Sequence, residues 1–169
     1  MATTLKARVN VDFAADLVSA LDLQTRRAPA ALKAAYALTN GTGAGEADIL
    51  WTDRRTIAAS TTEDLDLTAS LSDAFATSLT FARIKLIMVK AAAANTNNVH
   101  VGGDAAALVG WVGNASDLVV VRPGGMFLWV ATDATAAAVT ATTGDILQVA
   151  NSSSGTSVTY DIALVGSSV

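Results

Sequence analysis

The sequence contains no cysteine and only one histidine, His100. Without cysteine there is no disulfide framework, no thiolate nucleophile and no cysteine-ligated zinc or iron–sulfur site. A single histidine cannot build a multi-histidine metal site within one chain. We therefore expect no metal site, no cofactor and no catalytic residues, and the chain is predicted not to be an enzyme.

Charge and long apolar runs are also scarce. Only 15% of the 169 residues are charged while 51% are hydrophobic, a balance that argues against disorder. No apolar run reaches the roughly 18 residues that a membrane span needs, and polar residues follow the initial Met1 too soon for a signal-peptide core. We expect no membrane partner and no signal peptide.

The few charges are unevenly distributed. Residues 1–90 hold ten Lys/Arg and ten Asp/Glu, whereas residues 91–169 hold one arginine and five aspartates. Nucleic acid requires clustered positive charge to replace its counterions. The sequence therefore predicts no nucleic-acid partner.

The length fits a single domain, and its beginning has a clear strand pattern. From Leu5 to Phe13 every second residue is apolar, a period of two that predicts a half-buried strand. Residues 16–23 are compatible with a short helix or a strand, and Pro29 is expected to interrupt the element before it. The alanine-rich stretch 30–38 is compatible with a helix. We predict that residues 1–46 form a strand and an arm or long connection, with a possible short helix.

Residues 47–169 are predicted to form the body. Turn residues such as Gly102-Gly103-Asp104 and Pro123-Gly124-Gly125 separate short β-branched segments at intervals of about ten residues. This spacing predicts an all-β fold, an antiparallel β-sandwich or jelly roll. The expected strands are 47–59, 63–71, 79–90, 97–102, 107–112, 117–122, 125–131, 136–142, 145–150 and 156–165.

Three motifs superficially suggest chemistry. The glycine-rich stretch 41–45 lacks the flanking strand, helix and lysine of a phosphate site, so we interpret it as a flexible loop. Glu63, Asp64 and Asp66 lack the spacing of a calcium loop, and the alternation predicts Asp64 and Asp66 facing water. His100 alternates with two valines and is expected on the outer face of a strand.

The arginine pairs and the tryptophans are the remaining candidates for contacts. Arg26, Arg27, Arg54 and Arg55 are the only basic pairs, and they are compatible with pairing to Asp53 and Glu46 or with docking to an acidic protein surface. Trp129 is expected in the core. Trp51 and Trp111 are candidate interface aromatics, and Trp111, between glycines, could also stack on a sugar.

Most of the chain from about residue 46 to 165 resembles a loose group of small virion proteins of tailed bacteriophages. The motifs that carry this resemblance are framework motifs and not catalytic ones. They are Glu46-Ala47-Asp48, Asp53-Arg54-Arg55-Thr56, Glu63-Asp64-Leu65-Asp66-Leu67, Phe81-Ala82-Arg83-Ile84-Lys85, Asn95-Thr96-Asn97-Asn98-Val99, Arg122-Pro123-Gly124-Gly125, Thr143-Gly144-Asp145 and Thr156-Ser157-Val158-Thr159-Tyr160-Asp161.

The resemblance implies a structural component of the virion, assembled in the host cytoplasm and placed on the capsid exterior. It implies a homotrimeric decoration (cement) protein that bridges subunits of the major capsid protein. From the charge distribution and the irregular pattern of the arm, we expect residues 1–46 and the basic residues Arg26, Arg27, Arg54 and Arg55 to face the capsid. The alternative is a receptor- or glycan-binding module of a tail fibre or spike, which jelly-roll folds also support. A cell-wall hydrolase is the least favoured reading, because no acid pair can be singled out.

Overall fold

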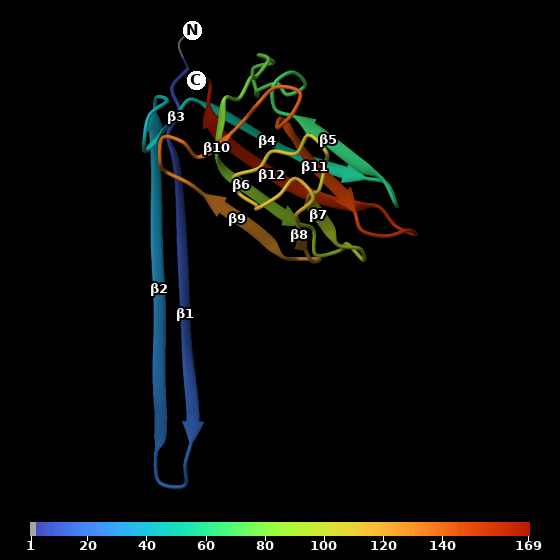
Figure 1. Cartoon of the computed structure of the whole chain (residues 1–169). Coiled ribbons are helices and arrows are strands. Elements are labelled where there is room, and N and C mark those ends of the chain that lie inside the picture. Colours follow the sequence, from blue (N-terminus) through green and yellow to red (C-terminus); the bar gives the residue numbers. More distant parts are fainter. Residues whose placement is uncertain (1–2) are drawn as a thin grey trace.

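The computed structural model describes residues 3–169 and has two parts, a long β-hairpin and a β-sandwich body from whose edge the hairpin projects (Figure 1). Every regular element in this range is a strand. The all-β prediction is therefore confirmed at the level of an antiparallel β-sandwich, while the narrower jelly roll stays a prediction.

The hairpin consists of β1 (Ala7–Ala20) and β2 (Thr25–Asn40), which pair antiparallel along their full length. A backbone hydrogen bond from Leu21 N to Gln24 O closes the turn at 2.9 Å. Hydrogen-bonded and non-hydrogen-bonded pairs alternate along an antiparallel ladder. Counting from the hydrogen-bonded pair at the turn, Asp16 and Pro29 form a non-hydrogen-bonded pair. The missing N–H of Pro29 therefore costs no bond within the hairpin, because this position points to the free edge of β2.

Two expectations for this region are wrong. Residues 30–38 were expected to be compatible with a helix, but they lie in β2, since pairing with β1 overrides a weak alanine preference. Pro29 does not interrupt the element, because it occupies an edge position of a two-stranded ladder. The strand predicted from Leu5 to Phe13 exists, but it begins at Ala7 and continues to Ala20.

The body contains two packed sheets. The larger sheet has the order β10-β6-β12-β4, with β9 pairing to the same strand β6, and the smaller has the order β5-β11-β7-β8. The short β3 pairs parallel with the end of β2. The strands are β3 (Glu46–Ala47), β4 (Ile49–Ile57), β5 (Thr62–Asp66), β6 (Arg83–Ala91), β7 (Val99–Gly102), β8 (Leu118–Val121), β9 (Met126–Val130), β10 (Ala137–Ala138), β11 (Ile146–Asn151) and β12 (Val158–Ser167).

Most predicted body strands have an observed counterpart, with three main differences. Segment 136–142 forms only the two-residue strand β10. Segment 107–112 forms no strand, and Ala107 makes only an isolated bridge to Ile146. Segment 63–71 is shorter than expected because β5 ends at Asp66. The Asp66 carboxylate accepts hydrogen bonds from the backbone N–H groups of Thr68 and Ala69, which turn the chain away from the sheet.

The core lies between the two sheets and is built from alternate residues of their strands. On β12 the inward side chains Val158, Tyr160, Ile162 and Leu164 are at most 2% exposed. They pack with residues such as Leu147 of the smaller sheet in one apolar cluster. Burial of this alternating set fixes which face of each strand points inward.

The hairpin is held to the body at its base. Lys85 of β6 is fully buried, and its ammonium donates a hydrogen bond to the carbonyl of Gly43 in the loop after β2. The Glu46 carboxylate accepts the Gly43 N–H at 2.9 Å, and Gly45 N donates to Thr132 O at 2.7 Å. The glycine-rich loop, which we interpreted as flexible, is thus hydrogen-bonded to the body through Lys85 and Thr132 and to its own Glu46. These bonds fix the direction in which the hairpin leaves the body.

Gly166 provides a test of this packing. It lies at the irregularity where β12 meets β6, and a Cβ there would sit 2.1 Å from the carbonyl oxygen of Arg83 and 2.7 Å from the Phe81 ring. We predict that Gly166→Ala lowers the free energy of unfolding by about 1–3 kcal/mol through overpacking. Chemical denaturation measures this, with Gly144→Ala as the control, because its Cβ would meet Thr140 at an ordinary 3.7 Å. Equal stability of the two variants would contradict the prediction.

Candidate functional site

The two faces of the projecting hairpin differ in character. Residues directly opposite each other in an antiparallel pair share a face, so the register assigns each side chain of β1 and β2 to one of two faces. One face is apolar along almost its whole length, and we call it the apolar hairpin face. It consists of Ala7, Val9, Val11, Phe13, Ala15 and Leu17 of β1 with Leu38, Tyr36, Ala34, Leu32, Ala30 and Ala28 of β2.

The opposite face, the polar hairpin face, carries charged pairs. Lys33 pairs with Asp12, directly opposite, at 3.1 Å, and Arg27 pairs with Asp16 at 2.9 Å. Both pairs are exposed, so each contributes little energy. Their placement shows that the polar hairpin face is exposed to solvent.

The apolar hairpin face is covered only at its base. Ala7, Val9 and Leu38 pack in a second apolar cluster against residues on the outer face of the larger sheet, among them Leu86 and Val165. Val11 still lines a groove together with residues of the body, and farther out the hairpin projects away from the body (Figure 1). Exposure there is high, at 55% for Phe13, 76% for Leu17 and 66% for Leu32.

The outer face of the larger sheet is itself only partly covered. A groove of about 660 Å³ runs between β1 and this face, with Met88, Leu128 and Ala163 in its lining. Leu50 and Met126 at the same groove are 43% and 59% exposed. The apolar hairpin face and the outer face of the larger sheet therefore lie next to each other, and both are only partly buried.

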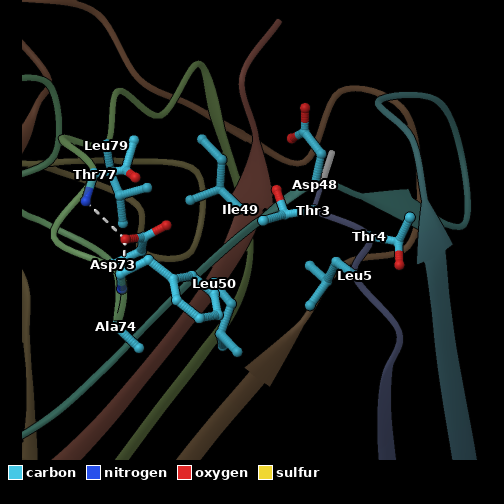
Figure 2. A pocket seen from close by; sticks show the side chains of 11 residues that line it. Thr3, Thr4, Leu5, Asp48, Ile49, Leu50, Asp73, Ala74, Thr77 and Leu79 are labelled. Carbon is cyan, nitrogen blue, oxygen red and sulfur yellow. Dashed lines mark hydrogen bonds between the residues drawn. The ribbon is translucent and has the colours of Figure 1, made fainter. Parts of the chain in front are cut away.

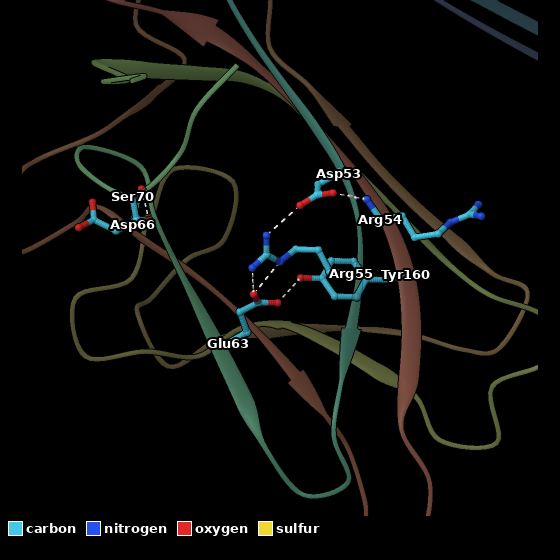
Figure 3. Close-up of polar contacts among 7 residues, drawn as sticks. All are labelled: Asp53, Arg54, Arg55, Glu63, Asp66, Ser70 and Tyr160. Carbon is cyan, nitrogen blue, oxygen red and sulfur yellow. Dashed lines mark hydrogen bonds and ion pairs between the residues drawn. The ribbon is translucent and has the colours of Figure 1, made fainter. Parts of the chain in front are cut away.

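A polar network closes one part of the body, between β4, β5 and β12 (Figure 3). Arg55 donates to Glu63 at 2.6 Å through Nε and to Asp53 at 2.8 Å, while the Tyr160 hydroxyl donates to Glu63 at 3.1 Å. The Arg55 guanidinium also lies 5.9 Å from the centre of the Trp51 ring. The one cation, Arg55, bonds both carboxylates, and Tyr160 donates to one of them, so the network acts as a structural brace.

The pKa shifts in the network follow from burial and pairing. Burial of the Tyr160 ring is the main cause that raises the pKa of its hydroxyl above the usual value, and the neighbouring Glu63 carboxylate adds to it. Hydrogen bonding to Glu63 is the main cause that raises the pKa of Arg55. Both shifts keep the network protonated, with a neutral phenol and a charged guanidinium.

The four arginines expected to contact the capsid lie in two separate regions. Arg26 and Arg27 lie near the hairpin tip, far from Arg54 and Arg55 on β4. Arg55 is bound within the network, and its partners are Asp53 and Glu63 rather than Glu46. Arg54 pairs across to Asp161 at 2.6 Å on the exposed outer face. The four arginines therefore do not form one basic surface, and their role as capsid contacts stays a prediction.

The tryptophans are mostly packed within the body. Trp51 is only 5% exposed, so its expected role as an interface aromatic is wrong. Trp111 is half-buried, its indole N–H donates to Leu108 O at 2.9 Å, and its ring lies 5.5 Å from that of Phe127. Trp129 packs against the main core cluster, in line with the expected core position.

The other sequence candidates also have structural roles. Leu65 and Leu67 are buried as expected, Asp64 accepts a hydrogen bond from Gln148, and Asp66 caps the turn after β5. Among residues 3–169, no group of three or more His, Cys, Asp or Glu side chains could hold a metal ion. Within the same range, no helix has the length and apolar character needed to cross a membrane.

A small pocket of about 280 Å³ lies between the N-terminal segment, the start of β4 and the loop 73–79 (Figure 2). It contains two carboxylates. Asp73 accepts the backbone N–H groups of Phe75 and Thr77 at 2.8 Å, and Asp48 accepts bonds from Ser168. These contacts assign both acids to holding local turns and the C-terminal end in place.

Comparisons of this chain with protein-family models, with curated proteins and with solved structures found no significant match. The fold and the candidate surface therefore rest on the structure itself.

Sequence reasoning missed the apolar hairpin face. The strand pattern of residues 5–13 was recognised, but the alternation continues to Leu17, and even-numbered residues from Ala28 to Leu38 form a matching apolar series. Pairing the two series about a turn near residue 22 would have indicated a hairpin. Pro29 obscured this signal.

Tyr160 gives the network a pH dependence that can be measured. Because its folded-state pKa lies above that of an unfolded tyrosine, about 10, its contribution is complete below pH 10 and is lost as the pH rises further. We predict that Tyr160→Phe lowers stability near pH 8 by about 1 kcal/mol but flattens the decline above pH 10. Urea unfolding at several pH values measures both effects.

The matched control is Tyr36→Phe, which removes the other tyrosine and leaves the network intact. The alkaline decline should persist in this variant. The same alkaline slope in Tyr160→Phe as in the parent protein would refute the assignment.

Proposed function

We propose that this chain is a non-enzymatic structural subunit of a virus particle, a decoration protein that binds the outer surface of a bacteriophage capsid. The observation that carries the proposal is the uncovered apolar hairpin face. A two-stranded hairpin alone in water is only marginally stable, and a large exposed apolar strip is typical of an interaction site. A subunit built to be covered by other proteins accounts for both properties.

The body supports the same role. Several of its acidic and basic side chains hold turns, join strands or belong to the Arg55 network. A stiff sandwich with an anchored arm suits repeated contacts on a lattice, where many weak contacts give high avidity. The resemblance to small virion proteins of tailed phages points in the same direction, including the capsid placement and the homotrimer, which stay predictions.

The alternative, a glycan- or receptor-binding module of a tail fibre, is less well supported. Its main candidate was Trp111 as a stacking platform. That side chain is partly buried beside Phe127 and Gly102, and its N–H is already bonded. The ring therefore presents little open face to a sugar.

The proposal predicts location and copy number. Quantitative mass spectrometry of purified phage particles should find this chain in a fixed ratio to the major capsid protein, with hundreds of copies per particle. Electron microscopy should place its density on the head. A few copies at the tail would instead support the fibre alternative, and absence from particles would overturn both.

A variant pair tests the role of the hairpin in particle binding. Leu32 lies on the apolar hairpin face and its neighbour Ala31 on the polar hairpin face, and both are exposed. We predict that Leu32→Asp reduces occupancy on particles at least tenfold, since burial of a leucine contributes about 1.5–3 kcal/mol. Ala31→Asp should bind like the parent protein. Equal occupancy for both variants would exclude the apolar hairpin face from binding.

A further inference from the structure

We infer that an extended segment of the capsid partner adds as a strand to the free edge of β1 and fills the groove beside it. The segment has an apolar side chain at every second position and acidic side chains between them. This inference rests on the proposed function and names the element of the partner that is bound. The groove lies at the hairpin base, whereas the highly exposed Phe13, Leu17 and Leu32 of the apolar hairpin face lie farther out.

The free edge of β1 presents unpaired backbone groups. In an antiparallel ladder, alternate residues direct their N–H and C=O groups to the partner strand, and the residues between them direct theirs away. Counting from the hydrogen-bonded pair at the turn, the odd-numbered residues of β1 bond to β2. Arg8, Asn10 and Asp12 therefore direct their backbone groups to the free edge, where residues 3–169 supply no backbone partner. Such an edge is a template for a further strand.

The groove runs along this edge and has an apolar floor. All residues from Leu5 to Asp12 line its volume of about 660 Å³, on both faces of β1, whereas no described residue of β2 does. In Figure 1, β1 is the hairpin strand nearer to β9. The floor consists of exposed or half-buried side chains of the larger sheet, namely Leu50, Met88, Met126, Leu128 and Ala163.

This floor determines the pattern of the added segment. Successive side chains of a strand point to opposite faces, so every second side chain of the segment would rest on the floor. Burial against methionine, leucine and alanine side chains favours apolar residues at those positions. The remaining side chains would point away from the floor, on the same side as the polar hairpin face.

The rim of the groove is basic. Lys6 and Arg8 line it and are exposed, and within residues 3–169 neither forms an ion pair. Asp12 is the one acidic side chain in the described lining, and it is paired with Lys33 at 3.1 Å. The unbalanced charge beside the groove is therefore positive. Opposite charges stabilise directly opposed positions of neighbouring strands, so acidic residues suit the outward positions of the segment.

A matched pair of proline substitutions tests the added strand. Asn10 and Ala35 lie directly opposite each other in the hairpin, and the N–H of each points to a free edge. Asn10→Pro removes the donor beside the groove, and Ala35→Pro removes one from the edge of β2, which already contains Pro29. Neither change removes a hydrogen bond of the hairpin, so both variants should keep the circular dichroism spectrum and melting temperature of the parent protein.

In purified phage particles assembled with each variant, Asn10→Pro should lower occupancy at least about tenfold, because a partner carbonyl loses its donor and meets the proline ring. Ala35→Pro should bind like the parent protein. Equal occupancy of the two variants, on particles from which Leu32→Asp is lost, would overturn the inference and leave the proposed function intact. If the parent protein alone forms a dimer that Asn10→Pro dissociates, a second copy fills the groove and the inference is wrong.

Hydrogen exchange of the particle-bound protein distinguishes an added strand from cover over a face. In residues 7–13 and 31–37, alternate N–H groups point to a free edge. Binding should slow exchange in residues 7–13 by about tenfold more than in residues 31–37. Equal slowing in both segments would refute strand addition.

A charge reversal tests the acidic character of the segment. Arg8→Glu changes the rim of the groove, and Arg122→Glu makes the same change at an exposed position outside the groove lining. Arg8→Glu should lower occupancy several-fold, and the difference should shrink as salt is added. Arg122→Glu should bind like the parent protein. Unchanged or stronger binding by Arg8→Glu would overturn the assignment of an acidic segment.

Discussion

The contact on which the structure depends is the packing of the hairpin base on the outer face of the larger sheet. Ala7, Val9 and Leu38 cover Leu86 and Val165, and the buried Lys85 holds the loop that joins hairpin and body. Without this contact, the apolar residues on the outer face of the larger sheet would be exposed to solvent. With it, the hairpin leaves the body in a fixed direction, and the alternation of the base continues outward to Phe13 and Leu17, which are exposed.

The body and the hairpin differ in how their side chains are covered. In the body, polar groups find partners within the chain, as the network of Arg55, Glu63 and Tyr160 illustrates. In the arm, polar groups pair on one face and apolar groups collect on the other. The division leaves the exposed apolar side chains on a strip two strands wide.

Several features could be read from the sequence because they depend on neighbouring residues alone. The period of two from Leu5 to Phe13 indicated a strand, and turn residues at ten-residue spacing indicated the β body. Asp64 and Asp66 were expected outside buried leucines, and Leu65 and Leu67 are buried. Segment 30–38 was misread, because alanine is compatible with both helix and strand until a partner strand decides. Trp51 and Arg55 were misplaced, since their surroundings come from strands distant in sequence.

The sequence alone determined the alternation of apolar and polar side chains, the positions of the turns and the absence of thiol chemistry, because these follow from residue type and spacing. Tertiary structure decided which alternating faces meet. It buried Trp51, divided the arginines between a brace, a surface pair and a distant tip, and left Phe13, Leu17 and Leu32 uncovered. The physical reason is that strand pairing joins segments far apart in the chain, and burial depends on what packs over a face rather than on its pattern.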